Sequence, residues 1–126
     1  MTLPQKTIIE PSHTLDHVRK SFNGATSRAA RSELGQFLSP VAIAQFMSSM
    51  FATGPQKVRV LDPGAGAGVL FATCIETMIS QDMPPLSIEV VAYETDRMIL
   101  PYLEDTMKRC QSLCMSSDID FCGRTL

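Results

Sequence analysis

The chain has 126 residues, 44% of them hydrophobic and 19% charged, with a formal net charge of −2 at pH 7. This length fits one small domain or a piece of a larger one, and the apolar fraction excludes a disordered tail. The weakly negative charge argues against a surface built throughout to neutralise nucleic-acid phosphates, and it leaves a local basic patch open. The chain does not open with the basic region and apolar core of a secretory signal. No apolar run approaches the roughly 20 residues that cross a bilayer. We therefore expect a cytoplasmic protein without a membrane partner.

The first 38 residues are expected to form an arm and a helical segment ahead of the main domain. Residues 1–11 contain two prolines and no clear hydrophobic period, which indicates an extended arm. Residues 17–31 are basic and contain no acid, so they present either a solvated helix face, which we favour, or a contact for DNA phosphates. A helix is favoured over residues 12–30, with an apolar face formed by Leu15, Val18 and Phe22.

A better-marked helix is expected from Pro40 towards Gly54. Ser39 can cap its free amide groups, Pro40 suits its first position, and Gly54 can adopt the left-handed conformation that ends a helix. The spacing then predicts an apolar stripe along one face, made of Ile43, Met47, Met50 and Phe51 with Phe46 at its edge.

Strands and helices alternate through the rest of the chain. We expect strands at residues 57–62, at 86–94 and from 118, and helices at residues 68–80 and 100–114. This order is typical of an α/β fold with a parallel sheet and right-handed crossovers. Because ligands bind such sheets beyond the carboxyl ends of the strands, Asp62 and Glu94, which end two successive strands, are expected at the binding edge.

A glycine-rich turn follows Asp62, with Gly64, Gly66 and Gly68 in GxGxG spacing. Val69 stands where a dinucleotide fingerprint would have its last glycine, and the lysine of a phosphate loop is missing. A diphosphate would face the Asp62 carboxylate with no cation to compensate, whereas a ligand with an ammonium and a sulfonium group would be attracted. S-adenosylmethionine has both groups, a carboxylate for the amides near the helix start, and two ribose hydroxyls for an acid at the end of the next strand. The alternative is a tight turn beside a solvated acid.

Three sequence blocks together resemble a known family. "ELGQFLSP" at residues 33–40, "VLDPGAGAGVL" at 60–70 and "VVAYETD" at 90–96 are similar to motifs X, I and II of DNA methyltransferases that methylate the N6 amino group of adenine. Motif X ahead of motif I is the γ order, found in type II restriction–modification enzymes and in the modification subunits of type I systems. The resemblance implies a class I S-adenosylmethionine-dependent methyltransferase fold, Rossmann-like and partial over residues 39–126, with an N-terminal helical extension.

The resemblance also assigns residues to a cofactor site. Motif X contacts the methyl donor, motif I places Asp62 near the methionine amine, and motif II places Glu94 on the ribose hydroxyls. For Phe37 a place in the core is an equal alternative. The residues that match cofactor contacts are Gln36, Phe37, Ser39, Asp62, Pro63, Gly64, Ala65, Gly66, Gly68, Glu94, Thr95 and Asp96.

The catalytic motif of that family, (N/D)PP(Y/F), does not occur in these residues. The only paired prolines, Pro84 and Pro85, precede the second strand, where the motif cannot function. We therefore expect a cofactor-binding N-terminal fragment of a DNA (adenine-N6) methyltransferase that is inactive unless other residues complete it. The alternatives are a non-catalytic module that holds the cofactor or a partner, and a fragment of an RNA or protein methyltransferase.

Two further features bear on partners. In the family's sheet the first strand is central, so residues 58–62 would here form an open apolar edge, for which we expect self-association, pairing with a second polypeptide, or poor solubility. The four cysteines lack the paired CxxC spacing of zinc sites, so reduced and packed thiols are expected instead of a metal site.

Overall fold

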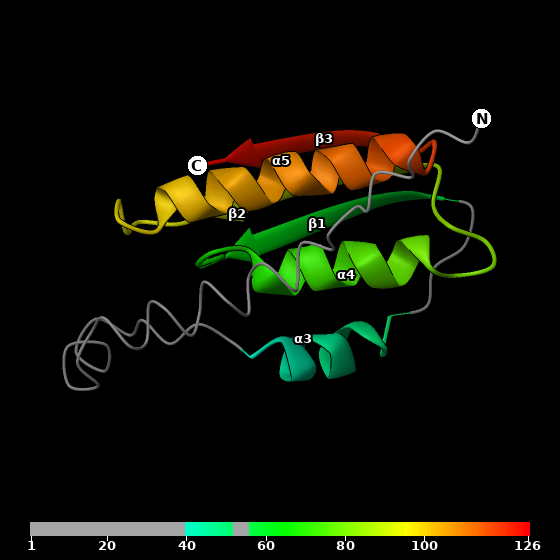
Figure 1. Cartoon of the computed structure of the whole chain (residues 1–126), viewed down its shortest axis with the longest axis horizontal. Coiled ribbons are helices and arrows are strands. Elements are labelled where there is room, and N and C mark those ends of the chain that lie inside the picture. Colours follow the sequence, from blue (N-terminus) through cyan, green and yellow to red (C-terminus); the bar gives the residue numbers. More distant parts are fainter. Residues whose placement is uncertain (1–39, 52–55) are drawn as a thin grey trace, which may run out of the picture.

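The computed structural model describes residues 40–51 and 56–126, which form a three-stranded parallel sheet with helices packed on it (Figure 1). The strands are β1 (Lys57–Pro63), β2 (Ser87–Tyr93) and β3 (Asp120–Thr125), in the order β1-β2-β3 across the sheet. The helices are α3 (Val41–Ser48), α4 (Val69–Ile79) and α5 (Leu100–Ser116). The predicted α/β fold and its parallel sheet are confirmed.

Several sequence predictions fall on residues outside the described ranges. They concern the arm, the helix and the basic stretch before residue 40, and the helix end at Gly54. The motif X residues Gln36, Phe37 and Ser39 also lie outside the described residues.

The two faces of the sheet differ in what covers them. On β2, Ile88, Val90 and Ala92 are buried, as alternation along a strand requires when one face packs against helices. The residues between them point to the opposite face, where Tyr93 of β2 and Leu61 of β1 are exposed. Within the described residues no strand pairs with the outer edge of β1, and the helices lie on one side of the sheet (Figure 1).

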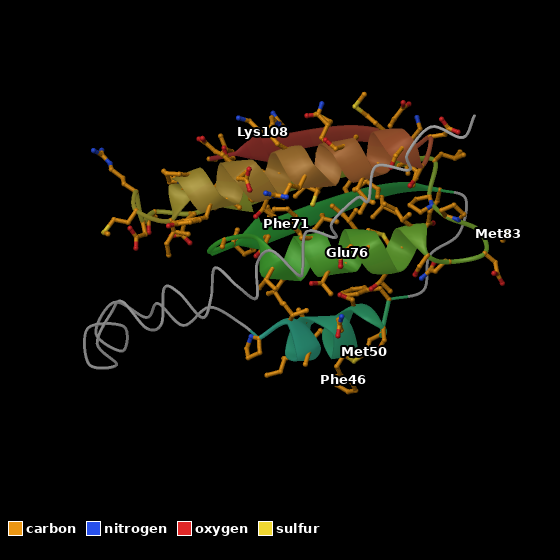
Figure 2. The ribbon with its side chains drawn as sticks, in the orientation of Figure 1. Phe46, Met50, Phe71, Glu76, Met83 and Lys108 are labelled. Carbon is orange, nitrogen blue, oxygen red and sulfur yellow. The ribbon has the colours of Figure 1, made fainter. Side chains whose placement is uncertain are left out.

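Helices α4 and α5 supply most of the core between the helices and the sheet. The α4 side chains Phe71, Ile75 and Met78 recur at helical spacing and are almost fully buried, as are Leu103 and Cys110 on α5. Figure 2 shows Phe71 on the side of α4 that meets the sheet. Burial of each large apolar side chain stabilises the fold by about 1.5–3 kcal/mol. The predicted helices 68–80 and 100–114 are confirmed to within two residues at each end.

The first described helix differs from its prediction. Helix α3 begins at Val41 because Pro40 has extended backbone angles (φ −62°, ψ 143°) and stands before the helix, and it ends earlier than predicted. It buries its small residues, Ala44 and Ser48, which allows it to lie close to α4. Figure 2 shows Phe46 on the side of α3 away from α4. The predicted apolar stripe is thus not packed into the core, and its members are 41–69% exposed: Ile43, Phe46, Met47, Met50 and Phe51.

Candidate cofactor site

The glycine turn between β1 and α4 is shaped by three residues with positive φ, Gly64 at +109°, Gly66 at +57° and Gly68 at +92°. At Gly68 a side chain is excluded twice, because the angle is left-handed and because a Cβ would lie 2.6 Å from the ring of Phe71. Gly68 therefore packs directly against Phe71, and α4 starts from the turn at Val69.

The amide groups of this turn are already used by the end of β2. The N–H groups of Gly64 and Ala65 both donate to the Tyr93 carbonyl at 2.9 Å. The Gly66 N–H donates to Oε2 of Glu94, also at 2.9 Å. A loop that binds phosphate instead points such N–H groups at its ligand. The turn is therefore anchored to the protein and is not arranged as a phosphate cradle.

Asp62 lies near the end of β1, beside Ala92 in the sheet register, and is only 9% exposed. Its Oδ2 atom is buried and has no hydrogen-bond partner among the described residues. Burial raises the pKa of this carboxyl above its ordinary value of 3.8, and the nearby charge of Glu94 raises it further. A buried carboxylate oxygen without a partner destabilises the fold, so the site suits a ligand that brings a positive charge or an N–H donor.

Glu94 follows β2 and touches two loops. Its Oε2 atom accepts the Gly66 N–H, and its Oε1 atom accepts the Asp96 N–H at 2.8 Å. Asp96 in turn accepts the Met98 N–H at 2.9 Å, which shapes the loop that leads to α5. The half-buried Glu94 carboxylate is therefore held at both of its oxygens.

The structure brings the predicted residues of motifs I and II to one edge of the sheet. Ala65 and Gly68 are buried in the turn, whereas Pro63 and Thr95 are exposed. Sequence reasoning missed the Tyr93 carbonyl that anchors the turn, because a backbone acceptor leaves no signature in the side chains. The residues gathered at this edge are Asp62, Pro63, Gly64, Ala65, Gly66, Gly68, Glu94, Thr95 and Asp96.

A cavity of about 480 Å³ reaches Asp62 and was not predicted from the sequence. Five successive residues of β1, 58–62, line it, which places it along the outer edge of the strand and not on one face. The cavity exists because of the way α3 packs beside β1 and α4, and no pattern in the sequence predicts that packing. Its other wall comes from α3 and α4 and is formed by Ala44, Met47, Ser48, Leu70, Phe71, Cys74 and Met78.

The four cysteines are free thiols. Cys110 and Cys114 are buried on α5, and burial raises the pKa of both, that of Cys114 to about 11. Thiols of this kind stay protonated and unreactive near neutral pH. Among the described residues no group of three histidine, cysteine or acidic side chains is placed to hold a metal ion. In the same part of the chain no helix has the length and apolar character needed to cross a membrane.

Comparison with known proteins adds sequence relationships to this geometry. No family model matches the chain. The chain is 34% identical over 95 residues to the type II methyltransferase M.BsuBI of Bacillus subtilis, an overlap of 75% of this chain and 18% of that protein. It is 26% identical over 107 residues to the type II methyltransferase M.PstI of Providencia stuartii, an overlap of 85% of this chain and 21% of that protein. The chain is related to type II methyltransferases.

The chain spans about a fifth of the length of the two methyltransferases that it matches. Its fold also resembles the solved structure of SCL7 from Oryza sativa, with a TM-score of 0.55 over 93% of this chain and 31% of that chain. At 16% identity this likeness concerns the fold alone. The predicted relationship to methyltransferases is confirmed at this level, and the adenine specificity and the γ order stay predictions.

Proposed function

We propose that this chain is the S-adenosylmethionine-binding part of a DNA methyltransferase that modifies the N6 amino group of adenine in a restriction–modification system. The observation that carries the proposal is the buried Oδ2 atom of Asp62, which finds no partner in residues 40–51 and 56–126 and lies near Glu94 at the carboxyl edge of a parallel sheet. The relationship to two type II methyltransferases supports the same function. In this proposal the sheet belongs to the class I, Rossmann-like methyltransferase fold.

The charge of the site favours a cationic ligand over a diphosphate. Glu94 lies close enough to raise the pKa of Asp62, and no described lysine or arginine forms an ion pair with either acid. A diphosphate placed there would meet like charge, and it would find the three amides of residues 64–66 already bonded. The ammonium and sulfonium groups of S-adenosylmethionine would instead neutralise the two carboxylates.

In the proposed complex each residue meets one group of the cofactor. Asp62 accepts a hydrogen bond from the methionine ammonium group, and Glu94 accepts the two neighbouring ribose hydroxyls. The amides in the first turn of α4, which has no side-chain cap, face the methionine carboxylate. The remaining proposed contacts come from motif X and from the turn and loop: Gln36, Phe37, Ser39, Pro63, Gly64, Ala65, Gly66, Gly68, Thr95 and Asp96.

The longer enzyme would carry out the reaction that this site prepares. The cofactor supplies an electrophilic methyl group, and residues 39–126 bind and orient it for attack by the adenine amino nitrogen. Residues 1–38 form the N-terminal extension in this proposal, DNA is the substrate of the longer enzyme, and the cytoplasm is its place of action.

Calorimetric titration of S-adenosylmethionine into the purified chain tests this proposal. We expect binding, and an increase of about 2.7 kcal/mol in the free energy of unfolding when the free cofactor is at 100 times its Kd. Asp62→Ala and Glu94→Ala should each weaken binding by about 10-fold or more, because each removes a hydrogen bond to a charged group worth about 1.5–3 kcal/mol.

Asp120→Ala is the matched control for the two acid substitutions. Asp120 is an exposed acid at the start of β3, and the start of a parallel strand lies at the edge opposite the proposed site. This variant should bind the cofactor as the unmodified chain does. Binding of NAD or ATP against the turn in place of S-adenosylmethionine, or unchanged affinity in Asp62→Ala, would contradict the proposal.

We also propose that the outer edge of β1 pairs with further polypeptide, either a second copy of the chain or a second polypeptide. The strand leaves backbone N–H and C=O groups unpaired along this edge within the described residues, and the cavity beside it is lined mostly by apolar side chains. Parallel sheets are normally covered on both faces, whereas the described helices all lie on one face of this sheet (Figure 1). The matched methyltransferases are about five times as long as the aligned region, so they contain chain enough to supply such cover.

A further inference from the structure

One side chain joins the two loops at the carboxyl edge of the sheet. The first loop is the glycine turn, residues 64–68, and the second, residues 94–99, leads from β2 to α5. The Glu94 side chain receives the Gly66 N–H on Oε2 at 2.9 Å and the Asp96 N–H on Oε1 at 2.8 Å. Each oxygen of the carboxylate therefore holds one loop.

We propose that Glu94 is a positioning residue that ties the glycine turn to the loop 94–99 before any ligand is bound. The tie, and not the negative charge alone, then gives the site its shape. Hydrogen bonds to an ionised acceptor are about twice as strong as those between neutral groups. A carboxylate that receives one such bond on each oxygen cannot rotate without breaking one of them, so its orientation is fixed together with that of both loops.

The backbone next to Glu94 supports the same tie. The carbonyl of Tyr93 receives the N–H groups of Gly64 and Ala65, so two successive residues at the end of β2 accept three successive amides of the turn. Two of the three donating residues, Gly64 and Gly66, have positive φ angles, which glycine adopts without strain. The Glu94 side chain thus adds a third hydrogen bond to the two by which the Tyr93 carbonyl anchors the glycine turn.

The tie has a consequence for binding, and this consequence rests on the proposed function. A carboxylate oxygen can accept two hydrogen bonds, so each oxygen of Glu94 keeps one acceptor position after it has received a backbone N–H. A ligand with two neighbouring hydroxyls would meet a carboxylate that is already oriented, and ordering it on binding would cost little entropy.

Nuclear magnetic resonance on the ligand-free chain tests the tie directly. In the unmodified protein we expect a scalar coupling across the hydrogen bond between the Gly66 amide nitrogen and the side-chain carboxyl carbon of Glu94, and slow solvent exchange of the Gly66 and Asp96 amides. Glu94→Asp keeps the charge but is one methylene shorter, so it cannot hold both amides. It should speed exchange at both amides by about 10-fold or more, the effect expected for losing a charge-assisted bond.

Two further variants separate the tie from charge and from general loosening. Glu94→Gln keeps the size of the side chain but has only one acceptor oxygen, so it should speed exchange at the amide that its NH₂ group faces. Asp62→Asn removes the neighbouring charge without touching the tie, and it should leave both exchange rates unchanged. Absence of the coupling in the unmodified chain, or slow exchange retained in Glu94→Asp, would overturn the proposal even if another variant failed to fold.

A titration with S-adenosylmethionine distinguishes failure of the tie from failure of the proposed function. If the unmodified chain binds the cofactor, Glu94→Asp should bind about 10-fold more weakly despite its conserved charge. Equal affinity in that variant would overturn the positioning role. If the unmodified chain shows the coupling but does not bind the cofactor, the proposed function fails and the tie stands.

Discussion

Gly68 is the residue at which backbone angle and packing together exclude a side chain. Its φ of +92° is left-handed, and an added Cβ would lie 2.6 Å from Cζ of Phe71. We expect Gly68→Ala to lower the free energy of unfolding by about 1–3 kcal/mol for the backbone angle. The contact with the buried Phe71 ring should add about 1–3 kcal/mol for overpacking. Urea unfolding followed by circular dichroism measures the change.

Gly64→Ala is the matched control within the same turn. Its φ is +109°, but no atom of the described residues lies within 4 Å of an added Cβ, so only the backbone contribution applies. The Gly68 variant should therefore be the less stable of the two. Equal losses in the two variants would mean that the Phe71 ring moves aside without cost.

The protonation of Asp62 links stability to pH. Burial, and then the charge of Glu94, hold its pKa above the ordinary value of 3.8, so the folded chain binds this proton more tightly than the unfolded chain does. The contribution of protonated Asp62 to the free energy of unfolding is fully present at pH values below the ordinary pKa. It is lost as the pH rises through the higher pKa of the folded chain. An asparagine at this position would not titrate, so the free energy of unfolding of Asp62→Asn, relative to the unmodified chain, should increase as the pH rises.

Urea unfolding of both proteins at a series of pH values from about 4 to 8 measures this difference. Other carboxyl groups titrate in both proteins and largely cancel, except Glu94, which interacts with Asp62. A difference that stays constant over the range, or that falls as the pH rises, would contradict the raised pKa. Because the same substitution should weaken cofactor binding, stability and binding are expected to change in opposite directions.

At the scale of residues, the sequence allowed the acids to be placed but not their partners. Asp62 and Glu94 were predicted at the binding edge because they end two apolar strands, and parallel strands end at one edge. The anchoring of the turn by the Tyr93 carbonyl and by Glu94 depends on backbone direction after Pro63, which no side-chain pattern encodes. The role of Glu94 as a loop tie was therefore missed, although the residue itself was singled out.

Among the described elements, an acidic side chain links the three strands on the sheet face opposite the helices. Glu89 on β2 accepts hydrogen bonds from Arg59 on β1 at 3.1 Å and from Arg124 on β3 at 3.4 Å. Because both arginines are largely exposed, each pair is worth at most about 1 kcal/mol. We expect Glu89→Gln to lower the free energy of unfolding by no more than about 2 kcal/mol in low salt, and by less in high salt.

Urea unfolding at low and high salt measures this effect, with Glu104→Gln as the control. Glu104 is an exposed acid on α5, so its substitution makes the same change of charge away from the sheet. If Glu89→Gln lowers the free energy of unfolding no more than Glu104→Gln does, or by an amount that does not depend on salt, the two ion pairs do not tie the strands.

The elements also show where prediction from the sequence succeeds. Helix α5 was predicted to start at Leu100 because Pro101 suits only the first turn of a helix, and it does start there. The prediction for α3 was wrong in its start because it placed Pro40 inside the helix, whereas Pro40 precedes it. The helix also ends at Ser48, short of the predicted end towards Gly54. The small residues Ala44 and Ser48 are the ones that α3 buries next to α4, so the large apolar side chains of the predicted stripe stay partly exposed.

For the whole molecule, the parallel sheet explains both the site and the open surface. The crossovers bring Asp62 and Glu94 to one edge, and the same connections place α4 and α5 on one side (Figure 1). The predicted open edge of β1 is found within the described residues. The pattern of β1 itself predicts the open edge but carries no information on a partner for it.

The open edge leads to a prediction about association. Leu61 on β1 is 65% exposed, and Leu86, which precedes β2, is 62% exposed. Replacing either by lysine therefore makes the same change in charge and nearly the same change in exposed apolar surface. Only Leu61 lies on the strand with the unpaired edge, and a lysine there disfavours pairing with another strand. Sedimentation equilibrium should show self-association of the unmodified chain at high concentration, about 10-fold weaker in Leu61→Lys and unchanged in Leu86→Lys. A clean monomer of the unmodified chain at high concentration would contradict self-association through this edge and leave a second polypeptide as the proposed partner. Equal weakening of association in both variants would mean that association depends on net charge and not on β1.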